Sequence, residues 1–211
     1  ALSLIGKSGV SVIRSKNKIR SSINYAAENT INNKILLEEF LNGPDFSLIS
    51  FVNDSKLYPI CFLEEINMER KDGSFIAKGY KTHESDSYNW RQQAYNIAKK
   101  IILEFNIKRS AFMISFRSDS KNNLRLMEVH LDLGGDLMIE AFYPKALPFD
   151  FLELAVELAS GKAKRLTNFH VKPTAIFYKE GHDLLSDRDY EIFTANTNHM
   201  LEEKILKASI N

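Results

Sequence analysis

Two neighbouring stretches with a two-residue period constrain this chain most, because that period is typical of a β-strand with two unlike faces. In Ser110–Arg117 the apolar side chains Phe112, Ile114 and Phe116 alternate with other residues. A polar turn follows, and a second extended stretch covers Leu124–Asp136. Together the two stretches predict an antiparallel hairpin whose first strand offers an apolar face to a core.

The other face of the predicted hairpin is polar. Alternation places Ser115 and Arg117 on that face of the first strand, and it places Glu128, His130 and Asp132 on one face of the second. A carboxylate, an imidazole and a carboxylate at three successive same-face positions are unusual for a strand with an apolar reverse side. A functional face and a plain solvated face both fit this pattern.

Composition limits the class of protein. The chain has 211 residues, of which 44% are hydrophobic, and this is enough for one large domain or two small ones. A net charge of +1 gives no reason to expect nucleic acid or an anionic membrane surface as a partner. The single cysteine, Cys61, excludes an intramolecular disulfide and fits a reducing compartment. No stretch reaches transmembrane length and no signal peptide opens the chain, so we expect a soluble, cytoplasmic protein.

Most of the remaining chain also has a recognisable local pattern. Apolar residues at helical spacing predict amphipathic helices, and alternating runs between turn residues predict strands. The segments indicate an α+β protein with antiparallel strands. We expect helices at 15–29, 94–105, 150–161 and near the carboxyl terminus beyond 187. We expect strands at 9–13, 46–53, 57–65, 74–80 and 163–178, the last of which is broken at Pro173.

A bend in the chain at Gly43-Pro44 separates two apolar runs. The run from Ile35 ends at Glu38 and Glu39, and an alternating run begins at Phe46. The pattern predicts a strand, a sharp bend and a second strand, with carboxylates near the bend. An ordinary connection between two strands would have the same pattern.

The sequence around this bend, Leu-Leu-Glu-Glu-Phe-Leu-Asn-Gly-Pro-Asp-Phe-Ser, resembles the hinge of ATP-grasp enzymes. In that family the hinge backbone reads adenine, and an acidic residue just past the glycine holds the ribose. The resemblance implies that Glu38, Glu39, Phe40 and Leu41 frame adenine and that Asp45 holds the ribose.

The first residues contain a second candidate phosphate-binding segment. Residues 1–8 satisfy a loose Walker A pattern, but that motif needs a preceding strand and a following helix, and here a predicted strand follows. The segment Gly6–Val10 instead resembles the glycine-containing loop with which the ATP-grasp lid covers phosphates. This resemblance implies phosphate contacts from Lys7, Ser8 and Gly9. Any hairpin turn could look the same.

The polar hairpin resembles the strand pair that binds metal in ATP-grasp enzymes, in which two glutamates and an asparagine hold Mg²⁺ on the ATP phosphates. Glu128 matches the second glutamate, and the Leu-Gly-Gly-Asp tail at 133–136 also matches. Three positions depart from the family pattern: Ser115 replaces the first glutamate, His130 the asparagine, and Asp132 an arginine. The resemblance implies a metal site at Glu128, His130 and Asp132 for Mg²⁺ or Mn²⁺, since imidazole tolerates Mn²⁺ better than Mg²⁺.

The resemblance implies an α+β ATP-grasp fold with antiparallel sheets flanked by helices, lacking the amino-terminal α/β domain and half of the lid. We expect a partial lid at 1–40, a carboxy-terminal lobe at 41–181 and a helical extension at 182–211. A homo-oligomer, or another chain that supplies the missing part, is the expected partner.

The implied function is an ATP-dependent ligase that activates a small-molecule carboxylate as an acyl phosphate for attack by an amine or similar nucleophile. The three departures at the metal strands motivate an alternative, which is a degenerate, non-catalytic module for nucleotide binding or interaction. An unrelated α+β binding protein is a third interpretation.

Overall fold

The structure is a computed structural model, and it describes residues 9–32, 34–69, 75–83, 89–135, 137–162, 166, 169–179 and 190–209. The candidate residues Lys7 and Ser8, and Asp136 of the matching tail, lie outside the described residues. The chain divides into two compact units. The first comprises residues 1–41 and 67–78, and the second comprises residues 42–66 and 79–211.

In its described residues, the first unit contains one α-helix, at the place the sequence predicted. A 3₁₀ turn, η1 (Lys16–Lys18), leads into α1 (Ile19–Glu28). Near it, Arg14 forms an ion pair with Glu69 at 2.6 Å, and its guanidinium lies 5.3 Å above the ring of Phe40.

Two predicted strands of the first unit are wrong. Residues 34–42 have no regular secondary structure, although the apolar run from Ile35 predicted a strand. The side chains of Leu36 and Leu37 are 70% and 81% exposed. In the predicted strand at 9–13 only Ser11 makes an isolated bridge. A strand exists only where a second strand pairs with it, and sequence pattern alone does not supply that partner.

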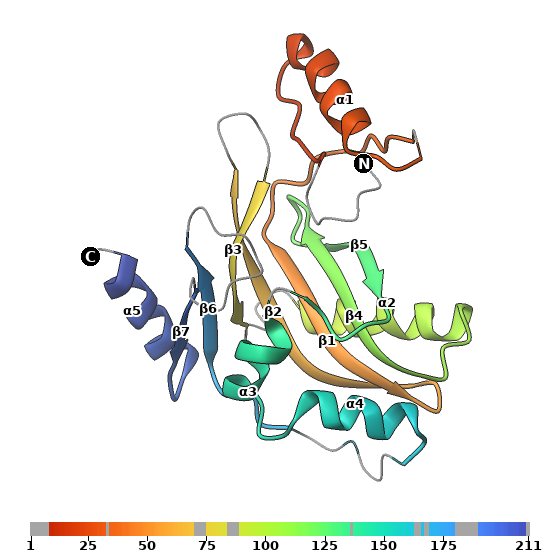
Figure 1. Ribbon diagram of the computed structural model, residues 1–211, viewed down its shortest axis with the longest axis vertical. Helices are drawn as coiled ribbons and strands as arrows, with labels where there is room; N and C mark the ends of the chain where they lie inside the picture. Colours follow the sequence, from red (N-terminus) through yellow and green to blue (C-terminus); the bar gives the residue numbers. More distant parts are fainter. Residues whose placement is uncertain are drawn as a thin grey trace. The chain divides into compact units, whose positions relative to one another are not determined.

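The chain forms a seven-stranded sheet in the order β5-β4-β1-β2-β3-β6-β7, in which the recorded pairings are antiparallel (Figure 1). Its strands lie in the second unit except for the end of β2 and the start of β3, residues 67–69 and 75–78, which belong to the first. The predicted antiparallel α+β class is thus confirmed. The strand β7 was not predicted from the sequence. The strands are β1 (Asp45–Asn53), β2 (Lys56–Glu69), β3 (Phe75–Thr82), β4 (Arg109–Ser118), β5 (Leu124–His130), β6 (Thr174–Tyr178) and β7 (Tyr190–Thr194).

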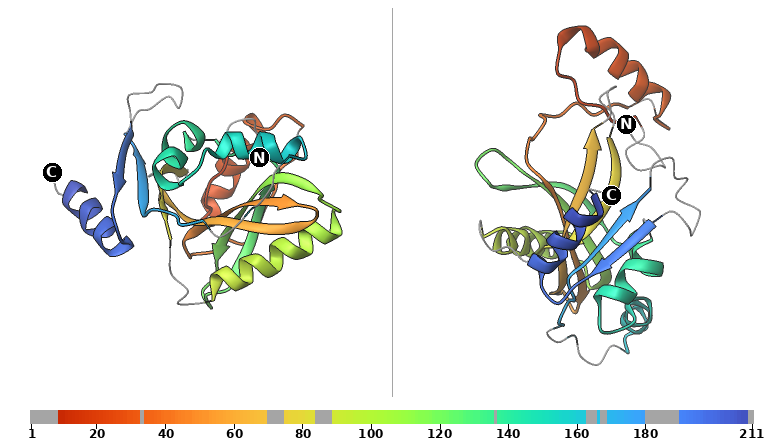
Figure 2. Two further views of the ribbon diagram at one scale, coloured as in Figure 1. Left: turned by 90° about the horizontal axis from the view of Figure 1, so that it is seen from below. Right: turned by 90° about the vertical axis from the view of Figure 1, so that its left-hand side faces the viewer.

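One face of this sheet packs against helix α2 (Trp90–Glu104), which lies across β1 and β4 (Figure 2). Helical spacing in the sequence predicted the helix, and alternation predicted the apolar face of β4. The hydrophobic core between them includes Phe46, Leu48, Phe62, Ala94, Ala98, Ile102, Phe112, Ile114 and Phe116.

The opposite face is covered in part by three consecutive helical segments, η2 (Met138–Phe142), α3 (Tyr143–Ala146) and α4 (Phe151–Ala159) (Figure 2). Phe151 of α4 stacks on Phe51 of β1, with 4.8 Å between ring centroids. Asp150 caps α4 by accepting a hydrogen bond from the Glu153 amide at 2.9 Å. The segments η2 and α3 were not predicted.

The predicted carboxy-terminal helix is α5 (Asn198–Ser209), which packs on β6 and β7. Its Leu201 is buried beside Ala175, and its Glu202 forms an ion pair with Lys81 of β3 at 2.6 Å. Within the part of the chain that the structure describes, no helix has the length and apolar character needed to cross a membrane.

Candidate functional site

The candidate site lies on the face of the sheet opposite α2, where β1, β4 and β5 carry polar side chains. Because side chains alternate along a strand, Asp45 and Ser47 of β1 share a face with Phe51, the residue that packs under α4. Asp45 pairs in register with Arg117 of β4, and Ser47 pairs with Ser115. One half of this face is therefore core beneath α4, and the other half is polar.

Asp45 and Arg117 form the strongest polar contact of this face. The Arg117 guanidinium donates from Nε to Oδ1 and from Nη2 to Oδ2 of Asp45, both at 2.5 Å. The side chains are only 14% and 17% exposed. This hydrogen bond, with the charges of Asp45 and Glu65, raises the pKa of Arg117 although burial opposes it.

Two serines lie beside this ion pair. The hydroxyl of Ser115, the residue at the position of the family's first glutamate, lies 3.3 Å from the hydroxyl of Ser47. Ser115 in turn is directly opposite Glu128 on β5. The strand register thus places Ser115, Arg117 and Glu128 on one face of the sheet.

The structure brings the three candidate metal ligands together at the edge strand β5. His130 Nε2 lies 3.2 Å from Glu128 Oε1, and His130 Nδ1 lies 3.7 Å from Asp132 Oδ2. The other Asp132 oxygen, Oδ1, accepts a hydrogen bond from the Gly134 amide at 2.9 Å and so forms the turn after the strand. Both carboxylates are 62% exposed.

These residues do not form a metal cage by themselves. Among the described residues, no three His, Cys, Asp or Glu side chains are arranged to hold an ion. Mg²⁺ commonly keeps several waters and is bound by one or two carboxylates together with substrate phosphates. The exposed Glu128 fits an ion that arrives with phosphates, and it does not fit a resident metal held by protein alone.

The hinge residues up to Leu41 belong to the first unit. Glu38 and Glu39 are exposed, whereas Phe40 and Leu41 are partly buried. Of the three residues expected to contact phosphate, the structure describes Gly9. This residue is buried and has a φ of 72°, a backbone conformation that favours glycine.

Sequence reasoning missed two members of the polar face. Ser47 ends the hinge-like motif but was given no role, and Glu65 lies outside every motif; both join the face because β1 lies between β2 and β4. Glu65 is opposite Asp45 in the β1–β2 register. The period-two pattern of β1 could have placed Ser47, but only the strand order shows which residues it meets.

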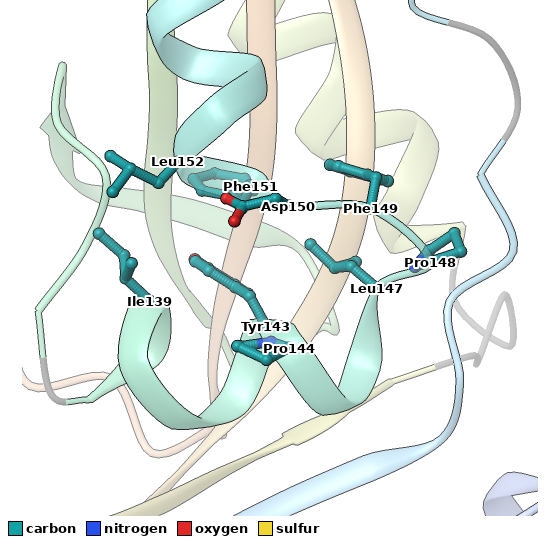
Figure 3. A pocket seen from close by; sticks show the side chains of 9 residues that line it. All are labelled: Ile139, Tyr143, Pro144, Leu147, Pro148, Phe149, Asp150, Phe151 and Leu152. Carbon is teal, nitrogen blue, oxygen red and sulfur yellow. The ribbon is translucent and has the colours of Figure 1, made fainter.

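A pocket of about 460 Å³ lies elsewhere in the second unit, at α3 and the start of α4, and contains none of the predicted site residues (Figure 3). Its lining is apolar except for Asp150, the cap of α4, and the phenol of Tyr143. Burial raises the pKa of Tyr143 well above its ordinary value. The apolar lining includes Ile139, Leu147, Phe149, Phe151 and Leu152.

A charged cluster also lies beside the α2 core. Glu64, which is opposite the core residue Phe46, lies 3.3 Å from Lys81 Nζ and 3.4 Å from His83 Nδ1. Burial raises the pKa of Glu64, but the hydrogen bond with His83 and the charge of Lys81 outweigh it, so the pKa is lowered.

Solved structures resemble this fold closely. N5-carboxyaminoimidazole synthetase from Staphylococcus aureus, complexed with ADP, has a TM-score of 0.69 at 14% identity, over 96% of this chain and 58% of that chain. Carboxyaminoimidazole ribonucleotide synthase from Aspergillus clavatus, complexed with ATP, has a TM-score of 0.67 at 12% identity, over 92% and 56%. The L-amino acid ligase from Bacillus licheniformis has a TM-score of 0.63 at 10% identity, over 80% and 52%.

No protein-family model matches the sequence, and no curated protein matches it. The chain spans a little more than half the length of these three structures, between 52% and 58%. At 10% to 14% identity the shared property is the fold. The chain has the ATP-grasp fold of these structures.

Proposed function

We propose that this chain binds ATP and takes part in ATP-dependent ligation of a carboxylate to an amine or similar nucleophile. The observation that carries the proposal is the polar face formed by Asp45, Arg117, Ser115 and Glu128, in a fold shared with chains solved with ADP and ATP. Clustered polar side chains on a face that is otherwise apolar core favour a binding site over a merely solvated surface.

Each candidate residue has a role in this proposal. Asp45 accepts hydrogen bonds from the ribose hydroxyls, and residues 38–41 frame adenine, chiefly through backbone groups. Lys7, Ser8 and Gly9 contact the phosphates. Glu128, with His130 and Asp132 beside it, holds the divalent ion that accompanies the phosphates, for which Mg²⁺ and Mn²⁺ both qualify.

The proposed chemistry has two steps. A carboxylate oxygen of the small-molecule substrate attacks the γ-phosphorus of ATP, and ADP leaves. The amine then attacks the acyl carbon, and inorganic phosphate leaves. The ion neutralises phosphate charge, while the protein positions the two reactants and keeps the charged groups oriented.

A second candidate function is nucleotide binding without turnover. It is favoured by Ser115, whose hydroxyl faces Ser47 where the family pattern has a carboxylate. It is also favoured by Asp132, which uses one oxygen to form the turn at Gly134. A site with a single well-placed carboxylate can bind an ion together with ATP and still align the phosphates poorly for transfer.

Calorimetric titration of the chain with ATP, with and without MgCl₂, tests the proposal. Glu128→Gln keeps the shape of the side chain and removes its charge, so we expect the magnesium-dependent part of ATP affinity to fall about tenfold or more. Glu104→Gln, at the exposed end of α2, is the matched control and is expected to bind as the wild type does. Equal binding by wild type and Glu128→Gln would remove Glu128 from the site.

Turnover separates the two functions. ADP and phosphate release that depends on added carboxylates and amines would support the ligase, whereas binding without release would support the module. Absence of any ATP binding would contradict both. Because the chain spans little more than half of the compared structures, the assay should also include the longest available form of the protein.

A further inference from the structure

The turn that precedes β1 is held against the end of β4 by three separate contacts. The first is the ion pair in which the guanidinium fork of Arg117 grips both oxygens of Asp45, at 2.5 Å on each side. A fork that meets a carboxylate with two parallel hydrogen bonds fixes its orientation as well as its charge.

The second and third contacts involve the next residue of β4, Ser118. Its amide donates a hydrogen bond to the carbonyl of Pro44 at 3.1 Å. Gly43 packs so closely on it that an added Cβ would lie 1.9 Å from the Ser118 hydroxyl oxygen and 2.3 Å from its carbonyl oxygen. Only glycine fits at this position, because the nearest atoms include backbone that cannot move aside.

We propose that Arg117 is a positioning residue, which holds the hinge turn at 42–45 against β4 and thereby orients the Asp45 carboxylate toward the ribose hydroxyls of the nucleotide. This inference rests on the proposed function, because it takes Asp45 as the ribose acceptor. A carboxylate has about four acceptor positions, and the fork uses one on each oxygen.

The arrangement has a consequence for affinity. A single carboxylate on a turn samples several rotamers, and nucleotide binding would have to order it. The Arg117 guanidinium orders the Asp45 carboxylate before the nucleotide binds. The charge of Glu65, which is opposite Asp45 on β2, also favours the Arg117 cation at this place. Loss of the fork should therefore weaken the ribose contact selectively, rather than nucleotide binding in general.

The experiment compares ATP with 2′,3′-dideoxy-ATP, which lacks both ribose hydroxyls, for wild type, Arg117→Met and Arg117→Lys. We expect the wild type to prefer ATP about tenfold, from the hydrogen bonds to a charged acceptor. The preference should fall below about twofold in Arg117→Met and take an intermediate value in Arg117→Lys, which keeps the charge and loses the fork. Arg125→Met removes an arginine paired with Asp119 on the same hairpin, and its preference should equal that of the wild type.

Hydrogen exchange of the Ser118 amide, measured without nucleotide, tests the hold on the turn independently of ATP. We expect exchange about tenfold faster or more in Arg117→Met and unchanged in Arg125→Met. Unchanged exchange in Arg117→Met, or equal weakening of both nucleotides, would overturn the inference while leaving the proposed function standing. A wild type that binds ATP without preference over the dideoxy nucleotide would also overturn it. If the wild type binds neither nucleotide, the proposed function itself falls.

Discussion

On strand β4, Phe112, Ile114 and Phe116 pack beneath α2, whereas Ser115 and Arg117 point to the opposite face and meet polar partners. The three apolar side chains are at most 1% exposed. The same ten-residue strand thus serves a core on one side and a candidate site on the other.

The two faces of β4 differ in what they contribute to folding and to binding. Burial of large apolar side chains dominates folding free energy, and one face of β4 supplies it. The serine pair and the exposed carboxylates of the polar face contribute less, about 1 kcal/mol or less each. Substitutions on the two faces should therefore separate a loss of stability from a loss of binding.

The largest expected effect is on the apolar face. Phe112→Ala should lower the free energy of unfolding by about 3–5 kcal/mol, because it removes a fully buried ring and leaves a cavity beneath α2. Urea denaturation followed by circular dichroism measures this, with Ser115→Ala on the other face as the control, expected to change stability by less than about 1 kcal/mol. Similar losses from the two variants would break the contrast between the faces.

An intermediate effect is expected on the polar face. Ser115→Glu restores the carboxylate of the family pattern directly opposite Glu128, and two like charges at paired positions should lower stability by about 1 kcal/mol. Added MgCl₂ with ATP should reverse the loss and tighten nucleotide binding. The thermal midpoint with and without MgCl₂ and ATP tests this, and Ser115→Gln, which has the shape without the charge, should show no such response. An equal response of the two variants would argue against an ion at Glu128.

The smallest expected effect concerns the charged cluster of Glu64, Lys81 and His83 on the α2 side. The pKa of Glu64 is lowered in the folded protein from its ordinary value of 4.5, so its ionised form stabilises the fold above about pH 4.5. That contribution is lost as the pH falls through the lowered pKa. Denaturation midpoints between pH 7 and pH 3 should show wild type more stable than Glu64→Gln by less than about 1 kcal/mol, with the difference shrinking below pH 4.5. A difference that grows on acidification would contradict the sign.

Much of the second unit follows from local sequence. Alternation places β1, β4 and their apolar face, and helical spacing places α2, α4 and α5, because both periods are properties of consecutive residues. Alternation also places Glu128 and His130 on one side of β5, as the register with β4 confirms. The Asp150 cap of α4 was predictable for the same reason.

The remaining features of the fold and of the candidate site depend on contacts between segments that are distant in the sequence. The apolar run from Ile35 predicted a strand, yet residues 34–42 form none, because strand pairing depends on two segments and not on one. Asp45 and Arg117 are 72 residues apart, and no local pattern predicts that they meet. Their ion pair arises because antiparallel pairing of β1 with β4 sets them opposite each other, on a face that α4 leaves to polar side chains. Strand order and register depend on segments that are distant in the sequence. They bring polar side chains from separate strands together into the candidate site.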